Sequence, residues 1–408
     1  MNDMAAGTER DDAAKRGTPG EVFATFLKLG LTSFGGPIAH LGYFRDELVQ
    51  RRNWIDEKGY ADLVALCQFL PGPASSQVGF AMGLLRGGPL GALAAFIAFT
   101  LPSAIVLIAF AYGAAAFGGT VGSGIINGLK IVAVAIVAQA VCGMAKNLCP
   151  DRERATIALA AVLIVIGVAG AFGQVAAIIA GGLAGLWFCR NDSEAVSGHI
   201  SFPVSRHVGA ICLALFAVLL IGLPLAASVA GNQGLSVFDS FYRAGSLVFG
   251  GGHVVLPLLE SEVVLPGWVS HDQFLGGYGM AQAVPGPLFT FAAYLGTVLG
   301  PEPNGIAGAA IALIAIFLPG FLLLIGTVPF WNVFRARPKA QAMMRGANAA
   351  VVGILGAALY DPVFTSAIVS SATFALALVC FVLLMVWKAP PWIVVIVAAF
   401  GGVGISLI

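Results

Sequence analysis

Two short motifs in this sequence combine glycine and proline with polar side chains, and each motif occurs twice. The first is SFGGP at residues 33–37, and FGGG at residues 249–252 is its counterpart. Paired glycines permit positive φ angles, while proline has no amide hydrogen to donate and suits the first turn of a helix. A hydrophobic helix that contains this motif is therefore predicted to break beside a polar cavity. The residues assigned to this site are Ser33, Gly35, Gly36, Gly250 and Gly251.

The second motif is QFLPGP at residues 68–73, and it recurs as QAVPGP at residues 282–287. Each proline disfavours the α conformation in the residue before it, so two prolines around a glycine predict an unwound segment. A half-helix that begins at Pro73 leaves its first amides unpaired at a positive dipole end, which is a ready anion site. Gln68 and Gln282 stand in apolar runs, where we expect buried amides that need a polar partner. The residues assigned to oxyanion binding are Gln68, Pro71, Gly72, Pro73, Ser75, Ser76, Gln282, Pro285, Gly286, Pro287 and Thr290.

The alternative for this second motif is a hinge that binds no ligand. Thr290 stands opposite Ser76 in the repeat, whereas Phe289 stands opposite Ser75. Of the two hydroxyl donors in the first half, only Ser76 therefore has a hydroxyl counterpart in the second half.

Charged side chains within the hydrophobic segments are few. Lys28 and Arg243 occupy the same position of the repeat. Charges inside a membrane are costly and usually functional, so two equivalent cations suit a divalent oxyanion. Snorkelling to the membrane surface is the alternative. The candidates for proton coupling are Glu47, Glu262, Asp62, His40 and His253, with solvated or hydrogen-bonded polar groups as the alternative.

The composition identifies the elements that must position these residues. Of the 408 residues, 59% are hydrophobic and 10% are charged, and the mean hydropathy is +0.93. Soluble domains carry about 25% charged residues, so the chain is predicted to be an all-α polytopic membrane protein. The balance of 21 basic and 20 acidic residues gives no case for nucleic-acid binding. The sequence holds no paired metal-ligand, nucleotide-binding or hydrolase motif, so we expect no enzyme activity, no cofactor, no metal, and transport powered by a gradient.

Hydrophobic runs predict thirteen transmembrane helices, near residues 22–44, 61–84, 89–116, 121–145, 155–171, 174–189, 208–230, 238–259, 274–299, 306–332, 343–360, 364–387 and 391–408. The sequence also repeats itself. Residues 26–41 match 241–256, residues 67–73 match 281–287, and residues 99–103 match 316–320. One extra helix between two six-helix halves would invert the second half, and inverted repeats with broken helices near the midplane are typical of secondary transporters.

The predicted organisation has four parts. They are a disordered cytoplasmic tail at 1–20, a first repeat at 21–189, a cytoplasmic linker with a connecting helix at 190–237, and an inverted repeat at 238–408. Loops on the side of the N-terminus hold fourteen basic residues, and those on the other side hold Arg45, Arg51, Arg52 and Lys58. The positive-inside rule therefore predicts a cytoplasmic N-terminus and a periplasmic C-terminus.

With these motifs in view, the chain resembles a long-chain, two-half member of the chromate ion transporter family. The similarity is carried by FLKLGLTSFGGP (26–37), RRNWIDE (51–57), QFLPGP (68–73), FGGGHVVLP (249–257) and QAVPGP (282–287). This resemblance implies proton-gradient-dependent export of chromate across the bacterial inner membrane, with chromate resistance as the result. It also implies a relation to sulfate, a tetrahedral dianion of similar size. A sulfate or other small-anion exchanger and an anion channel are the alternatives, and the partners expected are the oxyanion and the lipid bilayer, with a homodimer compatible with the sequence.

Overall fold

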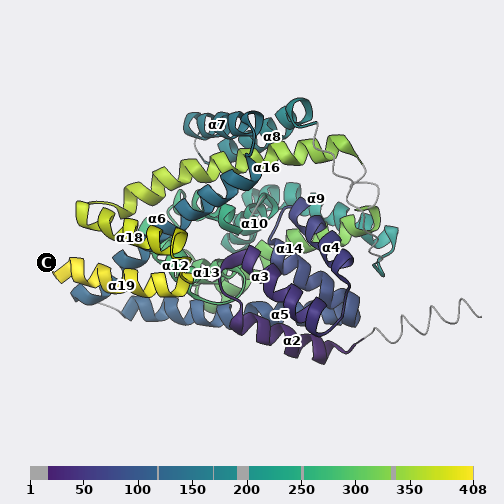
Figure 1. Cartoon of the computed structure of the whole chain (residues 1–408), viewed down its shortest axis with the longest axis horizontal. Helices are drawn as coiled ribbons and strands as arrows, with labels where there is room; N and C mark the ends of the chain where they lie inside the picture. The colour runs from purple at the N-terminus through teal and green to yellow at the C-terminus, as the bar shows by residue number, and fades with distance from the viewer. Residues whose placement is uncertain are drawn as a thin grey trace, which may run out of the picture.

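The computed structural model describes residues 17–116, 119–168, 170–190, 202–249, 252–331 and 337–407, and all of the regular elements in these ranges are helices (Figure 1). Residues 1–16 of the predicted tail, residues 191–201 of the predicted linker, and Gly250 and Gly251 lie outside the described residues. The tail prediction is wrong at its end, because helix α2 already begins at Pro19. Thr18 caps it by accepting a hydrogen bond from the Glu21 amide at 3.2 Å, and proline suits the first helical position.

The first half contains seven α-helices and one π-helical segment among the described residues. They are α2 (Pro19–Thr32), α3 (Gly36–Phe44), η1 (Arg45–Arg51), α4 (Glu57–Phe69), α5 (Ala74–Ala116), α6 (Gly119–Leu148), α7 (Arg152–Gly167) and α8 (Ala171–Phe188). The connecting helix is α9 (Arg206–Ala230).

The second half repeats the order of short and long helices. It contains α10 (Gln233–Ser246), η2 (Gly252–Val254), α11 (Val255–Leu259), η3 (Glu260–Val264), α12 (His271–Ala283), η4 (Leu288–Thr290), α13 (Phe291–Val298), α14 (Gly305–Thr327), η5 (Val328–Phe330), α16 (Pro338–Ala358), η6 (Leu359–Phe364), α17 (Thr365–Ala367), α18 (Ser371–Met385) and α19 (Pro391–Leu407).

Six helical stretches of the described residues are long and apolar enough to cross a membrane: Ala74–Gly113, Gly119–Leu148, Ala171–Phe188, Arg206–Ala230, Gly305–Phe330 and Pro338–Ala367. Helices α2 and α10 have 14 residues each, and α4 and α12 have 13. A rise of 1.5 Å per residue gives these four about 20 Å, which is short of a hydrocarbon core of about 30 Å. None of them can span a bilayer alone, and thirteen crossings in an inverted repeat stay a prediction.

The predicted helix breaks in the first half are confirmed. Helix α2 ends at Thr32 and α3 begins at Gly36, after Gly35 with a φ of +95°. Helix α4 ends at Phe69 and α5 begins at Ala74, with Gly72 at a φ of +119° between them. In the second half, α12 ends at Ala283 and η4 begins at Leu288, so the second proline motif breaks its helix too.

Helix α5 folds back on itself. Gly87 and Gly88 have non-helical backbone angles, and beyond them Gly91 lies against Gly83 so closely that a Cβ on Gly83 would overlap the Gly91 carbonyl. The second half repeats this hairpin with α13 and α14, where Gly296 lies against Gly308 in the same way. Each half therefore places a short helix antiparallel to a long one.

The halves also share their helix packing. Helix α2 lies along α5, and its Gly30 contacts the backbone carbonyls of Ala98 and Phe99 (Figure 1). Helix α10 lies along α14, where the equivalent Gly245 contacts the carbonyl of Ile316. A glycine permits this approach because any side chain would overlap the facing backbone. On the periphery, α16 runs along α7 and α8, and α19 runs along α6.

Candidate functional site

The broken segments of the two halves cross each other. The Gly72 amide donates a hydrogen bond to the Val248 carbonyl at 2.7 Å, and the Gly286 amide donates to the Ser33 carbonyl at 2.9 Å. Gly72 and Gly286 are equivalent in the repeat, and so are Ser33 and Val248. The proline motif of each half is therefore bonded to the glycine motif of the other half.

The third repeated sequence pair completes the crossing. A Cβ on Gly72 would lie 3.1 Å from the Cα atom of Gly320, and a Cβ on Gly286 would lie 2.7 Å from the Ser103 hydroxyl oxygen. Ser103 and Gly320 are repeat equivalents. Because both central glycines also have positive φ values, +119° for Gly72 and +102° for Gly286, no other residue fits without strain. All three repeated sequences thus meet at one place.

Polar side chains of the first half line this crossing. The Nδ1 atom of His40 lies 3.3 Å from the Ser75 hydroxyl oxygen, and its ring meets Phe99 edge-on at 5.4 Å. The Gln77 amide nitrogen donates to the carbonyls of Pro71 at 3.0 Å and Gly320 at 2.9 Å. Helix α5 thereby ties the first half to the helix α14 of the second.

Several buried polar atoms beside the motifs have no hydrogen-bond partner among the described residues. They are the hydroxyl oxygens of Ser33, Ser76 and Thr100, the Nε2 atoms of His40 and Gln282, and the Gln77 carbonyl oxygen. An unmade hydrogen bond on a buried polar group costs about 1–3 kcal/mol, so a cluster of them indicates a place for a polar ligand or water.

Some of the predicted binding residues are arranged differently. Gln68 is exposed, so the expectation that it is buried is wrong; an apolar run does not show which face of α4 is covered. The Thr290 hydroxyl donates to the Pro287 carbonyl at 2.7 Å and is thus bonded within its own 3-10 turn. The coupling candidate Asp62 is buried and accepts a hydrogen bond from the Trp331 indole at 3.2 Å. His253 contacts the Tyr278 hydroxyl through Nδ1 at 2.8 Å.

The repeated cations and the repeated glutamates form ion pairs with each other. Lys28 Nζ lies 2.8 Å from Glu47 Oε2, and Arg243 Nη2 lies 2.7 Å from Glu262 Oε2. Both pairs join residues at the same two positions of the repeat. Arg243 also pairs with Asp239 at 3.1 Å. The sequence assigned the cations to substrate and the glutamates to coupling, and the structure brings these two groups together.

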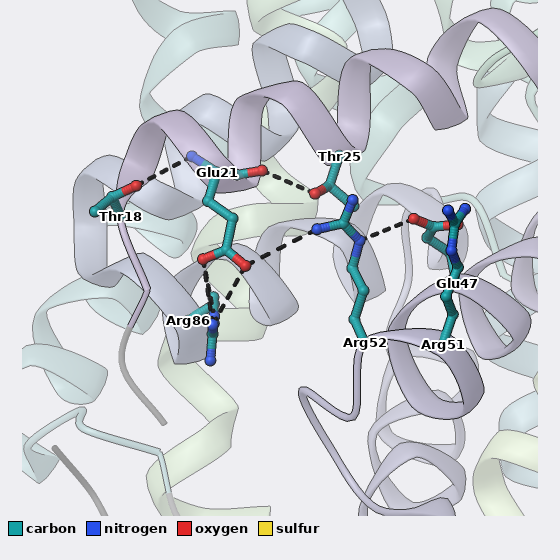
Figure 2. A network of polar contacts seen from close by, with 7 residues as sticks. All are labelled: Thr18, Glu21, Thr25, Glu47, Arg51, Arg52 and Arg86. Carbon is teal, nitrogen blue, oxygen red and sulfur yellow. Dashed lines mark hydrogen bonds and ion pairs between the residues drawn. The ribbon is translucent and has the colours of Figure 1, made fainter. Parts of the chain in front are cut away.

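In the first half Glu47 also belongs to a larger network, and Figure 2 shows its members other than Lys28. Glu47 also pairs with Arg52 at 2.8 Å and with Arg51 at 3.2 Å, while Glu21 pairs with Arg86 at 3.2 Å and lies 3.9 Å from Arg52. The described members are thus four cations, including Lys28, and two carboxylates. The corresponding group in the second half has one cation, Arg243, and two carboxylates, Asp239 and Glu262. Of these two described networks, only the one in the first half holds more cations than carboxylates.

The two glutamates differ in their acidity. Both come after the end of a predicted transmembrane helix, Glu47 after 22–44 and Glu262 after 238–259. Burial raises the pKa of Glu47, but hydrogen bonds from Lys28 and Arg52 outweigh it and bring the pKa down to about 2. Burial raises the pKa of Glu262, and its single cation Arg243 only partly offsets the rise. Of the two, Glu262 is therefore the carboxylate that takes up a proton more readily.

Four polar residues were not predicted from the sequence: Gln77, Thr100, Ser103 and Asp239. Two of them had a signal, because Gln77 directly follows Ser76 in the first turn of a half-helix and Ser103 ends a repeated Leu-Pro sequence. Away from the crossing, a cavity of about 440 Å³ lies between α5, α6, α12 and α13, and its lining residue Asp272 pairs with Lys130 at 2.7 Å. In the part of the chain that the structure describes, no group of three or more potential metal ligands comes together.

Comparison with known proteins agrees with this two-half arrangement. Residues 20–186 and, separately, residues 235–403 match the family described as Chromate transporter. The chain belongs to the chromate transporter family. The double match supports two homologous halves within this family.

Relatives are similar over nearly the whole length. A chromate transport protein of Pseudomonas aeruginosa is 30% identical over 94% of this chain and 91% of its own length. A probable chromate transport protein of Synechococcus elongatus is 29% identical, over 93% of both chains. A chromate transport protein of Cupriavidus metallidurans is 28% identical over 94% of this chain and 92% of its own. No solved structure matches this chain.

Proposed function

We propose that this chain is a secondary transporter that carries chromate, a tetrahedral oxyanion, across a membrane. The observation that supports it most strongly is the crossing, in which broken helices of two homologous halves bond to each other through Gly72 and Gly286. Broken helices at a repeat interface are the usual location of a substrate site in secondary transporters. The substrate is inferred from the relatives, which are chromate transport proteins.

The oxyanion binds beside the start of α5. Pro73 precedes this helix, and the amides of Ala74, Ser75 and Ser76 have no partner in a preceding turn. Amides at a helix N-terminus stabilise negative charge, and the buried Ser76 hydroxyl adds a donor. The positively charged network of the first half raises the local concentration of anions.

The second ion pair couples transport to a proton gradient. When Glu262 takes up a proton, Arg243 keeps Asp239 as a partner and adds its charge to the positive field that attracts the oxyanion. When the anion leaves, Arg243 pairs again with the Glu262 carboxylate and the proton is released. Lys28 stays bound to the ionised Glu47 and acts through the positive field of its network.

The finer topology is also part of this proposal. The halves are inverted repeats, α9 connects them, and the protein lies in the bacterial inner membrane with a cytoplasmic N-terminus and a periplasmic C-terminus. Transport is directed outward and confers chromate resistance. Sulfate has the same charge and tetrahedral geometry and is the competing substrate.

The test is uptake of radiolabelled chromate by proteoliposomes that hold the purified full-length chain. We expect saturable uptake that rises when a pH gradient is imposed and persists in excess sulfate. Absence of uptake above that of empty liposomes would refute the proposal. Uptake that ignores the pH gradient would indicate an anion channel, and uptake abolished by sulfate would indicate a general small-anion carrier.

A further inference from the structure

The crossing is symmetric in its backbone but not in its side chains. Four positions beside it carry polar side chains in the first half, and their repeat equivalents carry apolar side chains or none. The pairs are Ser33 and Val248, His40 and Val255, Ser75 and Phe289, and Ser103 and Gly320.

Two of the four polar residues contact one backbone position of the second half, and the other two contact each other. Gly286 donates its amide hydrogen to the Ser33 carbonyl, and its Cα lies against the Ser103 side chain. His40 joins this group through the 3.3 Å contact between its Nδ1 atom and the Ser75 hydroxyl. All four residues are 2% exposed or less, so they are separated from bulk solvent.

Two atoms of this group have unused hydrogen-bonding capacity. The Ser33 hydroxyl and the His40 Nε2 atom are buried and have no partner among the described residues. A buried group of this kind indicates a polar ligand, because leaving it unsatisfied is unfavourable. The Ser33 hydroxyl and the His40 Nε2 atom are separate from the α5 amides. They are therefore a second indication that a ligand binds at the crossing.

The equivalent place in the second half is filled by aromatic rings. Phe289, the counterpart of Ser75, lies 5.6 Å from Phe317, and Phe317 continues the cluster to Phe321 at 6.0 Å between ring centroids. Val255, the counterpart of His40, is fully buried. A dianion could not be solvated there.

We propose that Ser33, His40, Ser75 and Ser103 form one oxyanion-binding site per chain, built from the side chains of the first half alone. This inference rests on the proposed function and names the site at which the substrate binds. The Ser33 and Ser75 hydroxyls donate hydrogen bonds to the oxyanion, and the Ser103 hydroxyl does so by turning away from the Thr100 carbonyl that it bonds at 3.0 Å. Once His40 is protonated, its Nδ1 donates to the Ser75 hydroxyl and its Nε2 donates to the oxyanion. Binding of the dianion therefore favours the protonated form of His40.

The surroundings of His40 leave its charge to be balanced by the ligand. The segment before α3 presents the Ser33 backbone, and α5 presents Ser75 and Phe99. Across Gly36, η2 presents His253, whose Nδ1 atom is occupied by Tyr278. None of these described neighbours is a carboxylate.

The experiment measures equilibrium binding of radiolabelled chromate to the full-length chain in detergent. His40→Val and Ser33→Val introduce the residues that the second half holds, and Val255→Thr is the matched control at the position equivalent to His40. Loss of a hydrogen bond to a charged ligand weakens binding by about tenfold or more, so we expect at least that for His40→Val and a smaller loss for Ser33→Val. Val255→Thr should bind chromate as the wild type does.

The pH dependence supplies a second readout that folding alone does not change. The ratio of wild-type affinity to that of His40→Gln, measured at the same pH, should rise as the pH falls, because His40 takes up a proton that favours the dianion whereas the glutamine keeps a donor and takes up none. Size-exclusion chromatography confirms that each variant is folded, and His40→Gln replaces His40→Val if the latter is not.

Three results would overturn the inference. If the wild type binds chromate and both valine variants bind it equally well, the site lies elsewhere. If His253→Gln removes the pH dependence and His40→Gln does not, the proton is taken up on the other histidine. If Val255→Thr weakens binding as much as His40→Val, the site is not confined to the first half. Absence of binding to the wild type would instead refute the proposed function.

Discussion

Replacing Gly286 by alanine tests the crossing of the two halves. The new Cβ would lie 2.7 Å from the Ser103 hydroxyl oxygen and 3.2 Å from the Phe99 carbonyl oxygen, at a φ of +102°. A positive φ in a residue with a side chain costs about 1–3 kcal/mol, and overpacking of a buried site adds about 1–3 kcal/mol. We therefore expect Gly286→Ala to be destabilised by roughly 2–6 kcal/mol and to lose most chromate transport.

Gly267→Ala is the control that measures the cost of a positive φ angle alone. Gly267 also has a positive φ, +78°, but a Cβ there would meet nothing within 4 Å. It should lose only about 1–3 kcal/mol and keep its transport.

A second substitution isolates the contact itself. In the other half, Gly72 faces Gly320 where Gly286 faces Ser103. Adding Ser103→Gly to Gly286→Ala removes the nearest atoms, so the double variant should recover about 1–3 kcal/mol relative to the sum of the single variants. Apparent melting temperature in detergent is the assay for all variants, and chromate uptake is measured for the single glycine variants only, because Ser103 belongs to the proposed oxyanion site. The reasoning is refuted if Gly286→Ala melts at the same temperature as Gly267→Ala, or if Ser103→Gly restores no stability to Gly286→Ala.

The ion pairs give the remaining predictions. Lys28→Ala should raise the chromate concentration needed for half-maximal uptake. Arg243→Ala should raise that concentration and also lower the maximal rate. If both variants take up chromate as the wild type does, neither cation has a role in transport. Because the pKa of Glu47 in the folded chain, about 2, lies below its usual value of 4.5, its ionised form stabilises the fold above pH 4.5, and that contribution is lost as the pH falls from 4.5 toward 2. Glu47→Gln should therefore lower stability by about 1–3 kcal/mol at neutral pH and flatten the acid limb of a melting-temperature profile, and an unchanged profile argues against the network. The pKa of Glu262 is raised, so its ionised form opposes folding above that pKa, and stability increases as the pH falls through it. Glu262→Gln should consequently melt at or above the wild-type temperature, while its chromate uptake responds less to a pH gradient than wild-type uptake does. A destabilised variant with an unchanged pH response contradicts the assignment.

The helix breaks could be predicted from the sequence because their cause is local. Pro71, Pro73 and Gly72 determine their own backbone angles, and so do Gly35 and Gly36. The internal repeat also predicted which positions of the two halves are equivalent. The family matches the two halves separately, which agrees with that prediction.

Contacts between distant segments could not be predicted in the same way. Alignment placed Lys28 with Arg243 and Glu47 with Glu262, but only the structure shows that η1 returns to α2, and η3 to α10, so that each cation meets a glutamate. The burial of Gln68 was predicted wrongly because hydrophobicity along a helix does not reveal which face another helix covers.

Side-chain direction is equally inaccessible to a single sequence. Ser76 and Thr290 occupy equivalent positions, yet the first hydroxyl is without a partner among the described residues and the second is bonded to Pro287. The proline motif explains that a helix restarts near both residues. It does not determine whether the new turn is α-helical, as after Pro73, or 3-10, as after Pro287.

The central claim is that the oxyanion binds where the broken segments cross, and hydrogen–deuterium exchange of the full-length chain measures this most directly. The first amides of α5 have no helical partner, so a bound anion should slow their exchange. With chromate, compared with chloride at equal ionic strength, we predict slower exchange in peptides that cover residues 33–40 and 70–77. Chromate binding that leaves these peptides unchanged, or that protects only the cavity lined by residues such as Asp272, would contradict the account.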